Sequence, residues 1–115
     1  MPVIDSYSFG HIKIDGKSYY NDVIIFPEKV KSSWWRKEGH KLQVEDLRAV
    51  FDYKARVLIV GTGSSGFMDV PSETREHIRT HNIKLIVEKT KTACDKYNKI
   101  KDTDEKVVAA LHLTC

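Results

Sequence analysis

Apolar and polar residues alternate near the start of the chain, and this pattern predicts antiparallel β-structure. Ile12 and Ile14 alternate with polar neighbours up to the dipeptide Asp15-Gly16, and a period of two is typical of a strand with one buried face. Asp-Gly tolerates the positive φ angles that a tight hairpin turn requires. We therefore predict a β-hairpin here, followed by two further strands in residues 22–27 and 29–35.

The period changes in residues 44–55, where apolar residues recur at spacings that place them on one face of a helix. These residues are Val44, Leu47, Val50, Phe51 and Ala55. From Arg56 onward the pattern alternates between strand and helix, with strands expected in residues 56–60, 83–88 and 106–113 and helices in 71–81 and 92–100. The first of these strands is a continuous apolar run, as expected of a central strand covered on both faces.

These elements predict a single α/β domain over residues 1–115, in which an antiparallel N-terminal part leads into a βαβαβ unit. A chain of 115 residues is long enough for one hydrophobic core and too short for a cofactor domain plus a substrate domain. Its longest apolar runs have the length of strands and cannot span a bilayer. The opening residues show no basic region followed by an apolar one, so we expect a cytoplasmic protein.

Charge and cysteine content argue against a nucleic-acid-binding protein and against a disulfide-stabilised one. The formal net charge is +3, and the lysines that crowd the C-terminal third are interpreted as a solvated face, because no aromatic interleaving or nucleic-acid motif accompanies them. Nucleic-acid binding is therefore not expected. Cys94 and Cys115 are the only two cysteines, and their wide separation favours reduced thiols over a disulfide framework.

Gly61, Gly63 and Gly66 form the pattern G-x-G-x-x-G. In a dinucleotide-binding fold such a loop runs directly into a helix, whereas Pro71 delays the helix here, because proline is tolerated only in the first helical turn. Two interpretations remain. The glycines permit unusual backbone angles at the end of a strand, or the loop lines a pocket for an anion or a small polar ligand. The pocket candidates are Gly61, Thr62, Gly63, Ser64 and Ser65.

Four segments in one order, "LIVGTG", "PSETREHI", "TACDKYN" and "ALHLTC", resemble the Mth-type domain family. This family comprises small archaeal, bacterial and eukaryotic proteins, including an adipogenesis-associated member and, more distantly, an assembly factor of mitochondrial complex I. The resemblance implies three layers: a central mixed β-sheet with helices on one side and the N-terminal β-hairpin region on the other. It implies no catalytic residues and no cofactor.

Trp34 and Trp35 stand next to each other in a predicted strand. Successive side chains of a strand point to opposite faces, so we expect one tryptophan in the core and the other exposed. Arg36 and His40 follow closely enough to join the exposed one. We predict that Trp34, Trp35, Arg36 and His40 contribute to a surface that meets a partner.

His112 and Cys115 suggest a Cys-His nucleophile or a metal site at the tail. A spacing of three in an extended strand points the two side chains to opposite faces, so we expect tail packing instead. His77 and His81 lie one helical turn apart, but a metal centre needs three or four ligands. We predict neither a metal nor a cofactor.

The sequence favours a non-catalytic binding or assembly module, with a pocket at the glycine loop and a partner surface around Trp34 to His40. The alternative is a small-molecule enzyme that uses the same pocket, with His40 or His112 as general acid or base. The expected partner is another protein or a small anionic or polar ligand, and no membrane is expected. Pairing through an exposed hairpin edge would make a weak homo-oligomer, and otherwise we expect a monomer.

Overall fold

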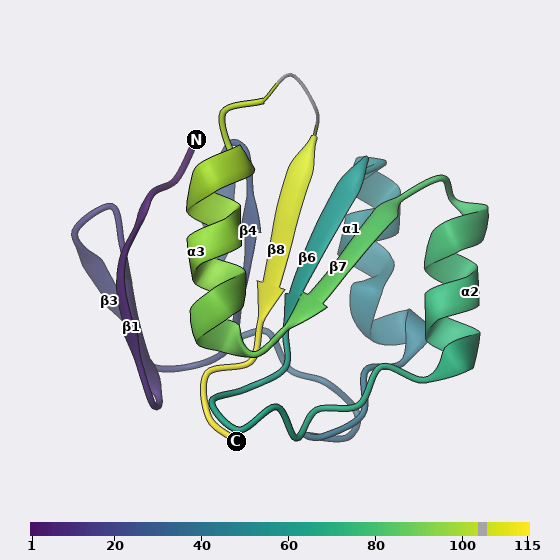
Figure 1. Cartoon of the computed structure of the whole chain (residues 1–115), viewed down its shortest axis with the longest axis horizontal. Coiled ribbons are helices and arrows are strands. Elements are labelled where there is room, and N and C mark those ends of the chain that lie inside the picture. The colour runs from purple at the N-terminus through teal and green to yellow at the C-terminus, as the bar shows by residue number, and fades with distance from the viewer. Residues whose placement is uncertain (104–105) are drawn as a thin grey trace.

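The computed structural model describes residues 1–103 and 106–115 (Figure 1). Within these residues the strands are β1 (Ile4–Ser8), β2 (His11–Ile14), β3 (Lys17–Tyr19), β4 (Val23–Phe26), β5 (Lys29–Lys31), β6 (Val57–Gly61), β7 (Lys84–Glu88) and β8 (Val107–Leu111). The helices are a 3-10 turn over Val44–Leu47 and then α1 (Arg48–Tyr53), α2 (Ser72–Thr80) and α3 (Thr90–Ile100). In the described part of the chain, none of the helices has the length and apolar character needed to cross a membrane.

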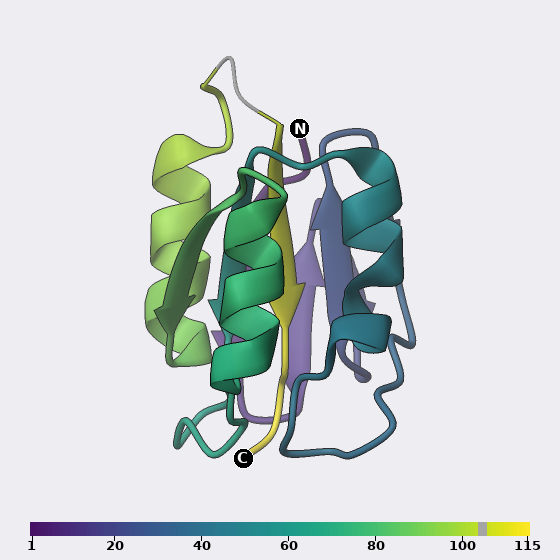
Figure 2. The same ribbon diagram turned by 90° about the vertical axis from the view of Figure 1, so that its right-hand side faces the viewer.

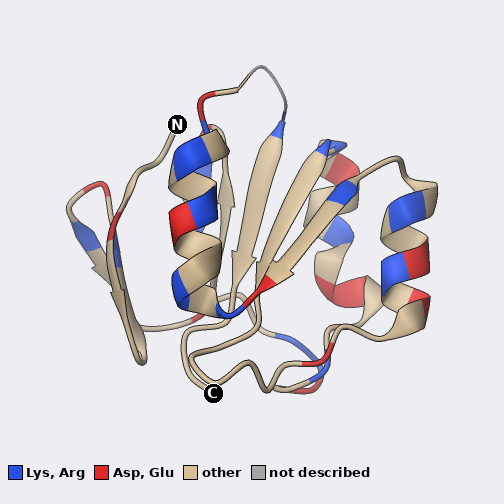
Figure 3. Cartoon of the chain, in the orientation of Figure 1, with Lys and Arg blue, Asp and Glu red and all other residues tan. Residues whose placement is uncertain are grey.

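A five-stranded mixed sheet forms the centre of the molecule, in the order β5-β4-β8-β6-β7. β6 pairs in parallel with both β7 and β8, whereas β4 pairs antiparallel to β5 and β8. β6 and β8 are buried along their whole length, and Figure 3 shows them free of charged residues between their ends. The start of β4 therefore lies beside the end of β8, with the end of β6 on the other side of β8.

A smaller antiparallel sheet, in the order β1-β2-β3, stands apart from the central sheet. Asp15 and Gly16 join β2 to β3 with φ angles of 48° and 79°, which confirms the hairpin turn predicted from this dipeptide. Ile12 and Ile14 are buried, as their alternation indicates. β1 adds a third strand that pairs with the other edge of β2.

Both faces of the central sheet are covered, and each face has its own apolar cluster. One cluster joins α1 and α2 to the sheet, and the other joins α3 and the small sheet to its opposite face. Figure 2 shows α1 and α3 on opposite sides of the sheet. The implied arrangement with every helix on one side is thus wrong. Ala93, Cys94 and Tyr97 bury one face of α3 beside the small sheet, because the small sheet alone does not cover that face.

Candidate functional site

Three charged or titratable side chains meet at the end of the molecule where β6 and β8 finish. Oδ2 of Asp22 lies 2.7 Å from Nη1 of Arg36 and 2.8 Å from Nδ1 of His112. Asp22 directly precedes β4 and His112 directly follows β8, so the antiparallel pairing of these strands brings the two residues together. Sequence reasoning named Arg36 and His112 but missed Asp22.

The hydrogen bonds determine which nitrogen of His112 carries the proton. The Asp22 carboxylate can only accept, so Nδ1 of His112 donates to it, and in the tautomer with its proton on Nδ1 the acceptor is Nε2. Nε2 lies 3.5 Å from Oγ1 of Thr114. Nη2 of Arg36 lies 3.0 Å from Nδ1 but donates to the Gly39 carbonyl oxygen at 2.9 Å. This arrangement resembles the paired carboxylate and imidazole of a general base.

Asp22 stays ionised in this cluster. Burial raises the pKa of Asp22, but hydrogen bonds from His112, from the Leu113 amide and from Arg36 outweigh it, so the pKa lies below its ordinary value. The Leu113 amide donates to Oδ1 at 2.8 Å, and the guanidinium of Arg36 lies 4.8 Å from the centre of a Trp34 ring. Asp22 thereby joins the start of β4 to both the tail and the segment that carries Trp34.

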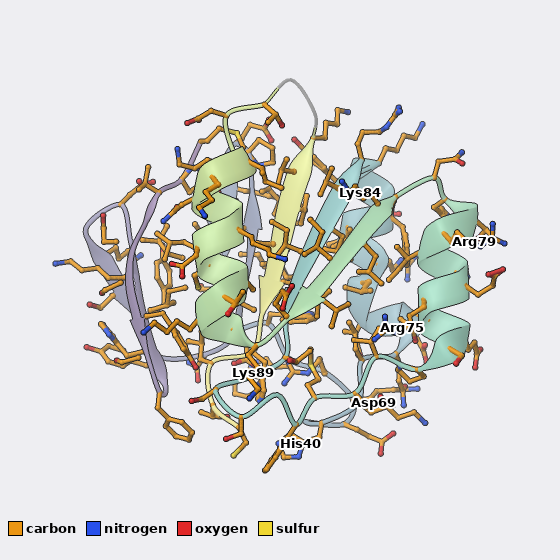
Figure 4. The ribbon with its side chains drawn as sticks, viewed as in Figure 1. His40, Asp69, Arg75, Arg79, Lys84 and Lys89 are labelled. Carbon is orange, nitrogen blue, oxygen red and sulfur yellow. The ribbon has the colours of Figure 1, made fainter. Side chains whose placement is uncertain are left out.

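The cluster is almost completely hidden from solvent. The Arg36 side chain is 4% exposed and His112 is 5% exposed. The exposed ring of His40 packs edge-on against His112, with 5.7 Å between centroids, and edge-on against Phe67, with 6.3 Å between centroids. Figure 4 shows His40 at the end of the molecule, beside the chain terminus marked C in Figure 1. His40 thus covers His112.

The glycine loop wraps around the tail of the chain. The Ser64 amide donates to the Thr114 carbonyl oxygen at 2.6 Å, and the Phe67 amide donates to the Cys115 carbonyl oxygen at 2.9 Å. The Gly63 amide donates to Oγ1 of Thr90, which in turn donates to the His112 carbonyl oxygen. These three amides therefore bind the protein's own chain.

The five predicted pocket residues divide into a buried and an exposed group. Gly61, Thr62 and Gly63 are buried, whereas Ser64 and Ser65 are exposed. Oγ1 of Thr62 donates to the Glu88 carbonyl oxygen at 3.1 Å. A ligand at this loop would meet the hydroxyls of Ser64 and Ser65 first, and the pocket itself stays a prediction.

The two tryptophans separate as expected, although they do not lie on a strand. β5 ends at Lys31, four residues before the predicted end, because Ser33 turns the chain with φ 55° and the Trp34 amide donates to the Asp22 carbonyl oxygen. Trp34 is 3% exposed and Trp35 is 76% exposed. Of the four residues predicted at a partner surface, Trp35 and His40 are exposed, whereas Trp34 and the Arg36 side chain lie beneath them.

Exposed aromatic side chains gather at this same end of the molecule. Six large hydrophobic residues are exposed among the described residues, and four of them belong to segments held to the tail or to Asp22. These four are Phe9, Tyr20, Trp35 and Phe67. We call them, together with His40, the aromatic end. Gly10, next to Phe9, donates to the Leu113 carbonyl oxygen, and Tyr20 lies two residues before Asp22. The other two, Met1 and Val3, belong to the opposite end, where Val3 is bonded to the turn residue Asp15.

The remaining chemical candidates are the two thiols and the two histidines at the end of α2. Cys94 and Cys115 are free thiols, and burial raises the pKa of Cys94 to about 12. His77 and His81 stack with 4.6 Å between ring centroids, beside Phe51. The described residues contain no group of three or more side chains that could hold a metal ion.

Comparison with known proteins agrees with this fold. The sequence model of the family described as "Protein of unknown function (DUF498/DUF598)" matches residues 4–112. The structure is similar to conserved hypothetical protein PH1505 from Pyrococcus horikoshii OT3, with 27% identity, a TM-score of 0.82, and coverage of 97% of this chain and 98% of that one.

Two further solved structures share the fold. A protein from Bordetella pertussis, described as a Mth938-like domain, is 19% identical with a TM-score of 0.72, covering 97% of this chain and 85% of that one. Another, from Bartonella henselae and described as an outer membrane protein, is 23% identical with a TM-score of 0.84, covering 99% of this chain and 96% of that one. The resemblance to Mth-type domains is confirmed, whereas the cytoplasmic location stays a prediction.

Proposed function

Because this chain belongs to the DUF498/DUF598 family, whose description names no activity, we propose its function from the geometry: a non-catalytic binding module that presents its aromatic end to a protein partner. The observation that carries this proposal is the concentration of Phe9, Tyr20, Trp35 and Phe67 at one end. Aromatic residues are enriched in the cores of protein interfaces and supply much of their binding energy.

The buried cluster beneath this surface supports the same function. Asp22, Arg36 and His112 hold together the segments that carry Trp35, His40 and the tail. An interface residue binds more tightly when its backbone is already ordered, because less conformational entropy is lost on association. The buried Asp22 cluster therefore keeps the backbone of the binding surface ordered before a partner binds.

The test compares two variants in which exposed hydrophobic side chains are replaced by serine, one at the aromatic end and one at the opposite end of the molecule. Tagged wild-type protein, Trp35→Ser/Phe67→Ser and the control Val3→Ser are used to capture partners from the cells that express the protein, with quantitative mass spectrometry as the readout. We expect one protein to be retained by the wild type and by the control and lost with the double variant. Equal retention by all three forms, or no enrichment over the tag alone, would contradict the proposal.

The pairing of Asp22 with His112 favours a second candidate, a small-molecule enzyme in which His40 or His112 is the general acid or base. Nε2 of His112 keeps an acceptor lone pair, and His40 lies over the ring where a substrate would enter. A thermal-shift screen of nucleotides, sugar phosphates and carboxylates on wild type and His40→Ala tests it. A compound that stabilises only the wild type would support a ligand site, since ligands that bind the folded state raise its apparent stability. No shift with any compound would contradict it.

A further inference from the structure

A cavity opens at the other end of the molecule, where the parallel strands begin. Its volume is about 670 Å³, within the range of small-molecule sites. The ends of α1 and α2 and the residues before β6, β7 and β8 surround it. Phe51, Ala55 and Ile83 give it an apolar floor.

Cationic side chains surround this floor. Lys54, Arg56 and Lys106 line the cavity together with His81, and within residues 1–103 and 106–115 no acidic residue is part of the lining. Within residues 1–103 and 106–115, Lys54 and Arg56 make no ion pair. Figure 3 shows basic residues at the starts of β6, β7 and β8, and Figure 4 labels one of them, Lys84, at this end. Among the described residues, Lys54, Arg56 and Lys106 therefore give the lining a positive charge.

The ends of two helices do not account for these cations. Cations are favoured near helix C-termini because the last carbonyl groups are unpaired. At the end of α1, the Lys54 amide donates to the Phe51 carbonyl oxygen and the Ala55 amide donates to the Val50 carbonyl oxygen. At the end of α2, the Ile83 amide donates to the Ile78 carbonyl oxygen. These carbonyl groups already have backbone partners, so the cations are not needed to satisfy them.

Lys54 occupies a backbone position that does not suit a lysine. It ends α1 in the left-handed region, with φ 61° and ψ 48°, where glycine or asparagine is usual. Non-glycine residues in strained backbone conformations cluster at functional sites. Its backbone conformation and its place in the cavity lining make Lys54 a candidate for contact with a ligand.

Two neighbouring rings, those of Phe51 and His81, line one part of the cavity. Their centroids are 4.7 Å apart and their planes are tilted by 35°, and His77 packs edge-on against Phe51 behind them at 4.9 Å. Planar rings pack well against such a surface, because offset and edge-on arrangements between aromatic groups are favourable. An apolar, ring-lined floor beneath a cationic rim suits a molecule that has both a flat ring and a negative charge.

We propose that this cavity is a second binding site, independent of the aromatic end, for a small planar aromatic anion that carries a carboxylate or a phosphate group. The ring of the ligand lies on Phe51 and Ile83. Its anionic group is held by Lys54 and Arg56, the latter through the paired N–H groups that suit carboxylates and phosphates. This site requires no residue of the Asp22 cluster.

The experiment is a titration followed in amide NMR spectra, with naphthoate and adenosine monophosphate as the two anionic probes. Naphthamide and adenosine are their neutral counterparts. We expect saturable shifts confined to the amides around Lys54, Arg56 and Asn82, with the stronger anionic probe identifying carboxylate or phosphate as the preferred group. The neutral counterparts should bind about tenfold more weakly, as expected when one charge-assisted contact is lost.

Three variants separate this site from general charge attraction. Lys54→Asn keeps a residue that tolerates the left-handed backbone and removes the charge, and Arg56→Gln removes the second cation. Each should weaken binding by about fivefold or more, whereas Lys13→Gln, an exposed lysine on the small sheet, should leave it unchanged. Melting curves check that each variant is folded. Shifts spread over α3, equal binding of neutral probes, equal weakening by Lys13→Gln, or no saturation would overturn the proposal.

Discussion

Gly63 is the residue at which the glycine loop and the tail come closest together. A Cβ atom there would overlap the carbonyl group of Cys115 and lie 2.9 Å from Cδ2 of His112, and φ at this residue is 108°. A side chain would therefore meet both a steric and a conformational obstacle. Gly61, two residues earlier, is also enclosed but less tightly, since its Cβ would lie 2.9 Å from side-chain atoms of Leu111 and Thr90.

Replacing Gly63 by alanine should separate the tail from the loop. We expect Gly63→Ala to lower the free energy of unfolding by roughly 2–4 kcal/mol, because overpacking adds to the strain of a positive φ. Gly16→Ala is the matched control, with φ 79° and nothing within 4 Å of its Cβ, and should lower it by only about 1 kcal/mol. Urea unfolding measures both. Equal losses would mean that the tail contact contributes nothing.

Asp22 makes the stability of the protein depend on pH in the acid range. The pKa of Asp22 is lower in the folded chain than in the unfolded one, so its stabilising effect is complete above the unfolded value of about 3.9 and is lost as the pH falls through the folded value. Asp22→Asn should lower the free energy of unfolding at pH 7 by about 3–5 kcal/mol, because Arg36 and His112 lose their anionic partner.

The difference between wild type and Asp22→Asn should therefore narrow below about pH 4. Urea unfolding at a series of pH values between neutrality and the acid limit measures this. Glu45→Gln is the control, since Glu45 is an exposed carboxylate that pairs with the exposed Lys37, and should change little at any pH. A gap for Asp22→Asn that is constant down to about pH 3 would show that its ionisation is not coupled to folding.

At the scale of elements, the end of α1 is held by the backbone more than by its side chains. α1 has six residues, follows directly on a 3-10 turn and has no basic residue in its last turn. The left-handed conformation of Lys54 allows the chain to reverse into β6, because the Lys54 amide still bonds within the last turn. The direction of β6, and with it the position of Gly61, depends on this reversal.

The same reversal can be made more stable. Lys54→Gly should raise the free energy of unfolding by about 0.5–1 kcal/mol, because glycine adopts the left-handed region without the steric strain of a Cβ atom. Lys54→Ala removes the same charge but keeps the Cβ atom, so it should not give this increase. Thermal unfolding of the two variants compares them directly. Equal stability would mean that the left-handed position is not strained.

At the scale of the whole molecule, the two cysteine thiols differ in how deeply they are buried. Cys94 is buried between α3 and the central sheet, with a pKa of about 12, whereas Cys115 is half-buried at the end of the molecule. Alkylating reagents attack the thiolate and need access to it. Cys94 should therefore react only when the chain opens.

We expect iodoacetamide at about pH 8 to modify Cys115 while Cys94 stays intact until denaturant is added. Mass spectrometry of the peptides containing each cysteine measures the two rates. Stability should also fall as the pH rises above about 8.5, because the unfolded thiol then ionises and the folded one does not. Equal rates for both thiols in the native protein would show that α3 opens easily from the sheet.

Much of the fold was predictable because its signals are local. The turn at Asp15-Gly16, the helical pattern of residues 44–55 and the apolar strand after Arg56 each depend on neighbouring residues. The Asp22 cluster was not predictable in this way, because Asp22 and His112 are 90 residues apart. Their contact follows from the pairing of β4 with β8, which no local pattern indicates. The end of β5 was missed for the same reason, since a bond to Asp22 positions Trp34.

The position of β8 has a consequence for the order in which the protein can fold. β8 is the last strand along the chain, yet it lies between β4 and β6 in the central sheet. While the chain is being synthesised, β4 and β6 cannot reach their final partner until residues 107–111 have left the ribosome. Both apolar clusters then close around one late strand, and such long-range pairing makes folding slow. Until β8 is available, the β-branched residues of β4 and β6 lack the strand that pairs with them in the finished sheet.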